Sequence, residues 1–256
     1  MSTSVLPPFL DPSDLSVSET AAAAAGPSSA RGASGAESAS GAATRSDLIA
    51  AALDLFGRKG FVATSTRDIA AAARVNIAGI AYHFGGKAGL HRACAEHIAA
   101  LVGTWFSAFE GASTPDPDDL SPEEAHAAIR TALGVLAHFM LARPEAEAVA
   151  RFMVREQMDP SPAFELVYAG LIRPRHERMC RLWARATGAA ADDEEVILAV
   201  SALFGQIMFF RVGRATALRR LGWETIDDTN VERILSVVLD NLDAALASHR
   251  HRRSRP

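Results

Sequence analysis

Apolar residues recur at helical spacing along most of the chain, and no segment alternates apolar and polar residues as a half-buried strand does. This pattern predicts an all-α fold. The first helix is expected to begin at Thr44 or Arg45 and to end at Gly57 or Gly60, because glycine terminates helices. Its core-facing stripe follows i, i+4, i+7, i+8 spacing and consists of Leu48, Ala52, Leu55 and Phe56.

Two short helices joined by a tight turn are predicted between Ser65 and Lys87. The first, residues 66–73, is preceded by Ser65, which forms a capping-box pattern with Asp68. Asn76 is a preferred N-cap for the second, residues 77–82, which is too short to be stable alone. Neighbouring helices must therefore hold this second helix in place. Two helices connected in this way form a helix-turn-helix, which can place its second helix in the DNA major groove.

A longer helix is predicted to open at Lys87 and to run to the neighbourhood of Phe109, where a loop rich in Pro and Asp begins. Pro174 lies inside a later helical segment, so a kink or a break is expected near Ile172. The later helical segments are residues 123–141, 145–158, 163–187, 195–214 and 231–247.

These segments divide the chain into four regions. Residues 1–43 are rich in Ser, Ala, Gly and Pro, lack apolar periodicity and are predicted to be a disordered extension. Residues 44–90 are expected to form a helix-turn-helix DNA-binding domain, and residues 91–248 a helical ligand-binding and dimerisation domain. Residues 249–256 are predicted to be a basic flexible tail.

Composition is compatible with this division, since 49% apolar residues in 256 provide for a sizeable core. The formal net charge is −4, yet residues 44–97 contain seven basic and four acidic side chains, a local excess of +3. A locally basic region on an acidic protein fits binding of phosphate groups. An ordinary solvated surface explains the same excess, so charge alone leaves both interpretations open.

Several functional classes lack their sequence signals. Cys94 and Cys180 lie far apart in apolar helical contexts, which is typical of a reducing cytosol and not of a disulfide framework. No unbroken run of about 18 apolar residues and no export signal is found, so a cytoplasmic protein without a membrane segment is expected. His126, His138 and His176 lack metal-ligand spacing. No P-loop, GxSxG, HExxH or Gly-rich dinucleotide turn occurs, so we expect no enzyme, metal or cofactor.

The segment TSTRDIAAAARVNIAGIAYHFGGKAGL resembles the DNA-binding segment of TetR-family transcriptional repressors along its whole length. In that family a Thr-Arg pair opens the second helix, a small or polar residue caps the third, and a (Tyr)-His-Phe-x-x-Lys run leads into the fourth. These positions are Thr66-Arg67, Asn76 and Tyr82-His83-Phe84-Gly85-Gly86-Lys87. Within this family the sequence looks most like the CecR-type branch. The segments that carry this likeness are VNIAGIAYHFGGKAGL, IRPRHERMCRLWARATG and GQIMFFRVGRATALRRLGW, and the resemblance extends over residues 44–245.

The resemblance implies a DNA-contacting surface on the helix-turn-helix. It makes Arg67 the candidate for a bidentate contact with guanine, while Tyr82 and Lys87 would bind phosphates. Ile77 and Ala78 suit contact with thymine methyl groups. Ala81 departs from the family's common aromatic residue at that place, and packing against the fourth helix is the alternative use of Tyr82 and His83. The expected DNA-binding residues are Arg45, Thr66, Arg67, Asn76, Ile77, Ala78, Gly79, Tyr82, His83 and Lys87.

Aromatic and polar residues in the C-terminal part could line an apolar pocket for a small-molecule effector. Arg155, His176 and Arg211 would suit an acidic or polar group on that ligand, although core packing and salt bridges use the same residue types. The candidate ligand-binding residues are Phe139, Phe152, Arg155, Tyr168, His176, Trp183, Gln206, Phe209 and Arg211. Met153 and Met208 could line the same pocket.

The last two long helices, residues 195–214 and 231–247, carry apolar residues on more faces than one core needs. We expect them to pair in a homodimer with a four-helix interface, and a thick monomer core is the alternative. A two-fold dimer implies a near-palindromic DNA operator. The residues expected to meet there are Val196, Val200, Leu203 and Ile207, packed against Val237, Leu239 and Leu246.

Three functional hypotheses follow. The first is a sequence-specific, homodimeric transcriptional regulator, a repressor released from double-stranded DNA by a small molecule. The second is an enzyme or small-molecule carrier built on a helical bundle, in which the basic region is incidental. The third is a DNA-binding regulator that responds to no ligand.

Overall fold

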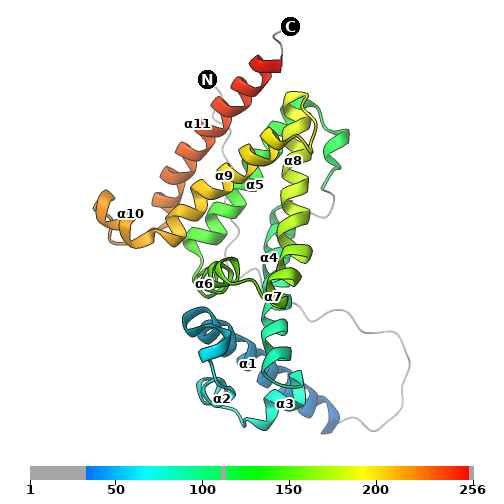
Figure 1. Ribbon diagram of the computed structural model, residues 1–256, viewed down its shortest axis with the longest axis vertical. Helices are drawn as coiled ribbons and strands as arrows, with labels where there is room; N and C mark the ends of the chain where they lie inside the picture. Colours follow the sequence, from blue (N-terminus) through cyan, green and yellow to red (C-terminus); the bar gives the residue numbers. More distant parts are fainter. Residues whose placement is uncertain (1–32, 111–113, 254–256) are drawn as a thin grey trace. The chain divides into compact units, whose positions relative to one another are not determined.

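The computed structural model describes residues 33–110 and 114–253, and all regular secondary structure within those residues is helical (Figure 1). The features discussed below lie in the compact unit formed by residues 40–256. Within the described residues, the all-α fold expected from the helical spacing of apolar residues is therefore confirmed.

The lobe expected to bind DNA consists of α1 to α3 with the first turns of α4 and is called the DNA-binding lobe below. The helices are α1 Ala33–Ala63, α2 Thr66–Ala73, α3 Ala78–Phe84 and α4 Lys87–Glu110. A non-helical residue, Gly60 with φ 82°, breaks α1 where glycine was expected to end it. Leu48 and Phe56 of α1, Ile69 of α2 and Ile80 of α3 are buried and form a common core.

The start of α1 differs from the expectation. The helix begins at Ala33, whereas the sequence pattern placed the first ordered residue at Thr44 or Arg45. The added segment contains several alanines, the residue with the highest helix propensity, so it can extend an existing helix without an apolar stripe of its own. Residues 1–32 of the predicted disordered extension lie outside the described residues.

The C-terminal domain contains the remaining helices. In chain order they are η2 Pro117–Asp119, α5 Pro122–Ala142, α6 Glu145–Met158, α7 Pro162–Val167, η3 Tyr168–Ile172, α8 Arg173–Thr187, α9 Glu194–Val212, α10 Arg214–Leu221 and α11 Asp228–Arg253. Ser121 and Glu124 form a reciprocal capping box at the start of α5. Where a kink or a break was expected before Pro174, the helical chain continues through the π-helical turn η3, which accommodates a proline that cannot donate a main-chain hydrogen bond.

The core of this domain surrounds α5, which packs against α8, α9 and α11. Trp183 of α8 is almost completely buried, and its indole N–H donates a hydrogen bond to His249 Nδ1 of α11 at 3.3 Å. The prediction of a flexible tail from residue 249 is therefore wrong for its first residues: α11 continues to Arg253, and His249 is 4% exposed. A buried indole needs an acceptor, and this requirement draws His249 into the core.

Two helices, α5 and α9, are long and apolar enough to cross a membrane by length and composition alone. Neither helix contains an unbroken apolar run of about 18 residues, and both qualify by mean hydropathy instead. The apolar character of α5 is accounted for by its place in the core, because 56% of its most apolar 18-residue stretch is buried. For α9 the buried share is only 22%, so a second apolar face remains on its surface.

Candidate nucleic-acid interface

The polar residues before α2 fix the direction in which the helix-turn-helix starts. Thr64 is 1% exposed, and its hydroxyl is within hydrogen-bond distance, as donor, of the carbonyl oxygens of Gly60 (2.7 Å) and Leu55 (3.2 Å). Ser65 caps α2 as predicted, because its Oγ accepts a hydrogen bond from the Asp68 N–H at 3.1 Å. The hydrogen bond with Ser65 and the nearby Lys59 ammonium keep the pKa of the Asp68 carboxyl below its usual value.

The turn between α2 and α3 uses one strained residue and one cap. Arg74 adopts the left-handed conformation with φ 57°, and its N–H donates to the Ala71 carbonyl at 3.1 Å. Asn76 Oδ1 accepts a hydrogen bond from the Ala78 N–H at 2.8 Å, so the predicted capping function of Asn76 is confirmed. Together these contacts set the angle between two helices that are both too short to stand alone.

One side of α3 is anchored and the other faces outwards. Ile80 is 2% exposed in the lobe core. A Cβ placed on Gly79 would lie 3.7 Å from Leu48 Cδ1, so Gly79 faces α1. The outward face consists of Ile77, Ala78, Ala81 and Tyr82, all of them exposed, with Tyr82 at 85%.

Among the expected DNA-contacting residues, Gly79 and His83 lie on the side of α3 that faces α1. His83 is half-buried, its ring centroid is 4.9 Å from that of Tyr82, and a Cβ on Gly41 would lie 3.9 Å from its Cε1. The His83 ring therefore lies next to α1. Ala81 takes a place on the outward face, and the i, i+3, i+4 relation to Ala78 and Ile77 is the signal that identifies it.

Cationic side chains surround this face. Arg67 is exposed at the start of α2, and no described residue holds its guanidinium in a hydrogen bond or ion pair. The Arg45 guanidinium lies over the Phe84 ring at 5.3 Å. The Lys87 ammonium lies 4.5 Å from the Phe61 ring centroid and 3.3 Å from the Val62 carbonyl oxygen, while Thr66 is half-buried. Cations around a small, apolar, outward-facing helix suit a surface that enters a groove between phosphates.

Comparison with known proteins agrees with this geometry. The family model of bacterial regulatory proteins of the tetR family matches residues 48–94, and that of the HTH-type transcriptional dual regulator CecR, C-terminal domain, matches residues 125–248. The HTH-type transcriptional dual regulator CecR of Shigella flexneri is 38% identical over 205 residues, covering 79% of this chain and 91% of that protein. The chain belongs to the TetR family, in its CecR-type branch.

Other relatives agree with this assignment. The probable HTH-type transcriptional regulator YttP of Bacillus subtilis (strain 168) is 51% identical over 47 residues, which cover 18% of this chain and 23% of that protein. The crystal structure of a TetR-like transcriptional regulator from Rhodococcus sp. RHA1 shares the fold with a TM-score of 0.55 at 21% identity, covering 80% of this chain and 96% of that one. This TetR-family protein is thus a DNA-binding transcriptional regulator, and homodimers are usual among such regulators.

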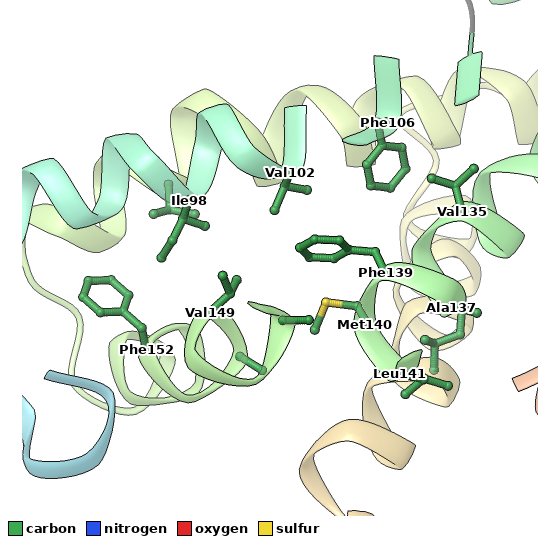
Figure 2. Packing of buried hydrophobic residues seen from close by; sticks show 14 of the residues in the cluster. Ile98, Val102, Phe106, Val135, Ala137, Phe139, Met140, Leu141, Val149 and Phe152 are labelled. Atoms are coloured by element: carbon green, nitrogen blue, oxygen red, sulfur yellow. The ribbon is translucent and has the colours of Figure 1, made fainter. Parts of the chain in front are cut away.

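The C-terminal domain of this TetR-family regulator contains an apolar cavity of 590 Å³ next to α4. Ile98, Val102 and Phe106 of α4 line one side of the cavity. Figure 2 shows them opposite Phe139 and Met140 of α5 and Val149 of α6, which also line it. Two arginines of α8 border it: Arg178 donates to the Pro115 carbonyl at 3.1 Å, and the Arg175 guanidinium lies 4.0 Å from the Phe106 ring centroid. Among the described residues there is no group of three or more His, Cys, Asp or Glu that could hold a metal ion.

The structure does not bring the nine candidate ligand-binding residues together. Phe139 lines the apolar cavity, as do Met153 and Met208, while Arg155 and Arg211 line a different pocket. Tyr168 and Phe209 are 39% and 53% exposed.

The remaining candidates have partners elsewhere. Trp183 is bonded to His249, Gln206 accepts from Asn241 at 2.8 Å, and His176 bonds to Ser201 at 3.1 Å. Phe152 packs against His91 at the junction with the DNA-binding lobe. The fact that a residue is aromatic does not say whether it lines the cavity or packs elsewhere. The arginines at the start of α8 are the sequence signal that could have indicated the edge of the cavity.

The junction between the lobe and the C-terminal domain contains a buried contact between a histidine and a glutamate. His91 of α4 and Glu156 of α6 are each 5% exposed, with His91 Nε2 3.3 Å from Glu156 Oε1. Phe56, Phe61 and Phe152 surround the imidazole at centroid distances of 4.7 to 5.0 Å. Burial lowers the pKa of His91, Glu156 opposes that change, and Lys87 reinforces it.

Stability is therefore expected to fall in mild acid. Because the folded state keeps the pKa of His91 below the unfolded value of about 6.5, protonation favours the unfolded state. Above about pH 6.5, titration of His91 should not change the free energy of unfolding. Between that pH and the lower pKa of the folded state, the free energy of unfolding should decrease as the pH falls. Urea unfolding at a series of pH values measures the effect. The His91→Gln variant, which keeps a donor for Glu156 and does not titrate, should show a flatter profile; an equally steep profile would exclude His91 as the cause.

Proposed function

We propose that this regulator is a homodimeric repressor that a small apolar acid releases from a near-palindromic operator. The observation that carries the proposal is the 590 Å³ cavity along α4, whose volume suits a small ligand. Its lining is mostly apolar, and Arg175 and Arg178 at its border offer guanidinium groups for a carboxylate. A regulator of this kind acts on DNA in the cytoplasm.

The helix α4 provides the route from cavity to DNA. Its first turn lies in the DNA-binding lobe, where Leu90 is fully buried, and Ile98, Val102 and Phe106 of the same helix line the cavity. A ligand that shifts α4 would move α3 with it, because Gly85 and Gly86 are the only residues between these helices. A hundredfold change in operator occupancy requires the ligand to favour the DNA-incompetent state by about 2.7 kcal/mol.

Binding of dodecanoate, an apolar acid, tests this mechanism. Titration calorimetry should detect dodecanoate binding to the free dimer, and saturating operator DNA should weaken that binding by the factor by which dodecanoate weakens operator binding. Arg175→Gln should lower dodecanoate affinity, whereas Arg173→Gln, on an exposed side chain of the same helix outside the cavity, should not. Equal affinity with and without operator would contradict ligand gating and favour a regulator that responds to no ligand.

Two substitutions separate base reading from phosphate binding. Arg67→Ala should cost about 1–3 kcal/mol and relax base preference at one position, because it removes a side chain that can bind guanine. Lys87→Ala should weaken binding to all sequences and reduce the salt dependence by about one phosphate contact. Binding to operator variants over a range of salt concentrations measures both. Thermal unfolding serves as the control for Lys87→Ala, since Lys87 also covers Phe61.

A further inference from the structure

Five arginines line a second pocket, of 930 Å³, where α1 of the DNA-binding lobe meets the C-terminal domain. Gly57 of α1 lines it together with residues of α5, α6, α9 and α10. It is distinct from the apolar cavity, because Val154 is the single described residue that lines both. Four of the arginines lie in helices, Arg151 and Arg155 in α6, Arg211 in α9 and Arg214 in α10, and Arg143 lies between α5 and α6.

Positive charge exceeds negative charge around this pocket. Glu147 and Asp159 are the two carboxylates among its described lining residues, against five guanidinium groups, and Glu147 is paired with Arg151. The Arg143 guanidinium lies over the Trp105 ring, 4.6 Å from its centroid.

The cationic groups act on one another. Arg211 is half-buried and donates to the main-chain carbonyls of Met140 and Arg143. Burial and the nearby cations of Arg214 and Arg151 lower the pKa of Arg211, and Glu147 only partly offsets them. Arginines that repel one another in a half-buried pocket are stabilised by an added anion, since each guanidinium can bind an oxyanion through two parallel N–H bonds.

Two of these arginines also hold the DNA-binding lobe. Arg151 Nη1 donates to Asp54 Oδ1 at 3.3 Å, and Arg155 Nη2 donates to the Arg58 carbonyl at 3.4 Å. Both acceptors belong to α1. An anion in the pocket would compete with α1 for the same guanidinium groups, so its binding would be felt at the junction that carries the DNA-binding lobe.

We propose that this pocket is a second effector site, which binds a small metabolite carrying two or more negatively charged oxyanion groups. Phosphate groups and carboxylates offer the same chemistry to guanidinium forks, and the pocket volume accommodates either kind of molecule. The site is independent of the apolar cavity and of the ligand proposed for it.

Titration calorimetry of the full-length protein without DNA tests the site, with inorganic pyrophosphate in one arm and citrate in the other. At an ionic strength of about 0.15 M, where weak surface attraction is screened, we expect one binding site per chain for at least one of the two anions. Binding of pyrophosphate alone assigns the site to phosphorylated metabolites, and binding of citrate alone assigns it to polycarboxylates. The absence of binding by both would overturn the proposal.

Matched variants locate the binding. Arg214→Gln should lower anion affinity at least about tenfold, because Arg214 is part of the pocket and, within the described part of the chain, its guanidinium donates to the Thr225 hydroxyl at 3.3 Å. Arg219→Gln makes the same change on an exposed side chain of α10 outside the pocket and should leave affinity unchanged. Arg155→Gln provides a second test from another helix, with thermal unfolding as the check on folding. Equal losses in Arg219→Gln and Arg214→Gln would reduce the effect to general surface charge and contradict the site.

Discussion

Replacing Ala78 by glutamate is expected to lower operator affinity at least about a hundredfold, or 2.7 kcal/mol, with little change in stability. Ala78 lies on the outward face of α3, near the start of the helix, where it has no core contact to lose. In the DNA complex this face would meet the floor of the major groove, and a carboxylate there would be desolvated among DNA acceptors and phosphates. The measurement is operator affinity by fluorescence anisotropy, with thermal unfolding of the free protein.

A matched control separates this local effect from added negative charge. Ala127→Glu makes the same chemical change at an exposed position of α5, in the C-terminal domain, and should leave operator affinity within about twofold at physiological salt, where charges more than about 8 Å apart are largely screened. If Ala78→Glu binds the operator like the parent, α3 is not the helix that enters the groove.

The helix-turn-helix could be predicted from sequence because local contacts determine it. The bounds of α2, Thr66–Ala73, were predicted exactly, since Ser65 caps its start and Arg74 leaves the helical conformation at its end. The bounds of α6, Glu145–Met158, were also predicted exactly, with Pro144 directly before the helix. These signals act between residues close in sequence, so no knowledge of tertiary packing is needed to interpret them.

Features that depend on distant residues were predicted less well. The inclusion of His249 in the core depends on the indole of Trp183, which is far away in sequence. The candidate effector residues were chosen by chemical type. Whether each one lines the cavity depends instead on which side of its helix faces α4 or α5. The orientation of Gly79 and His83 towards α1 is likewise a property of the packed lobe. Sequence periodicity identifies a helix and its apolar faces, but when several faces are apolar it does not say which neighbour each one meets.

The expected dimer surface illustrates the same point. Residues Val196, Val200, Leu203 and Ile207 were predicted to meet a partner, but they are all at most 3% exposed and belong to the core of a single chain. Leu246 is equally buried, Leu239 is half-buried, and only Val237 is exposed, at 60%. Because α9 is apolar on opposite faces, the choice of inward face could not be made without the packing of α5 and α11.

The surface that remains on α9 has the features of a helix-pairing seam. Exposed residues recur at spacings of four and three, as in a heptad pattern: Leu198, Ala202, Gly205, Phe209 and Val212. A similar exposed series on α11 consists of Val237, Asn241, Ala244 and Ser248. The hydrogen bond between Asn241 and Gln206 joins the two helices, which lie beside each other in Figure 1. We propose that these two series, and not the buried stripe, form the four-helix interface of the homodimer.

Leu198→Glu is therefore expected to convert the dimer into a monomer at micromolar concentration, because it places a charge in a buried apolar seam. Leu198 is 60% exposed in the single chain, so the monomer itself should remain folded. Operator affinity should fall by about two orders of magnitude or more, since the second reading helix no longer binds as part of the same molecule. Sedimentation velocity and operator binding measure the two effects.

Two further variants make the test specific to the seam. Leu221→Glu makes the same change at a residue of α10 that is 47% exposed and outside the seam, and it should leave the dimer intact. Gly205→Leu should also dissociate the dimer. Apart from its own helix backbone, a Cβ at Gly205 meets no atom of the described residues within 4 Å, so the monomer tolerates the larger side chain, which obstructs only a closely packed partner helix. If Leu198→Glu and Gly205→Leu both sediment as dimers, the subunits associate through a different surface, and the spacing of the two reading helices would have to be derived from that surface instead.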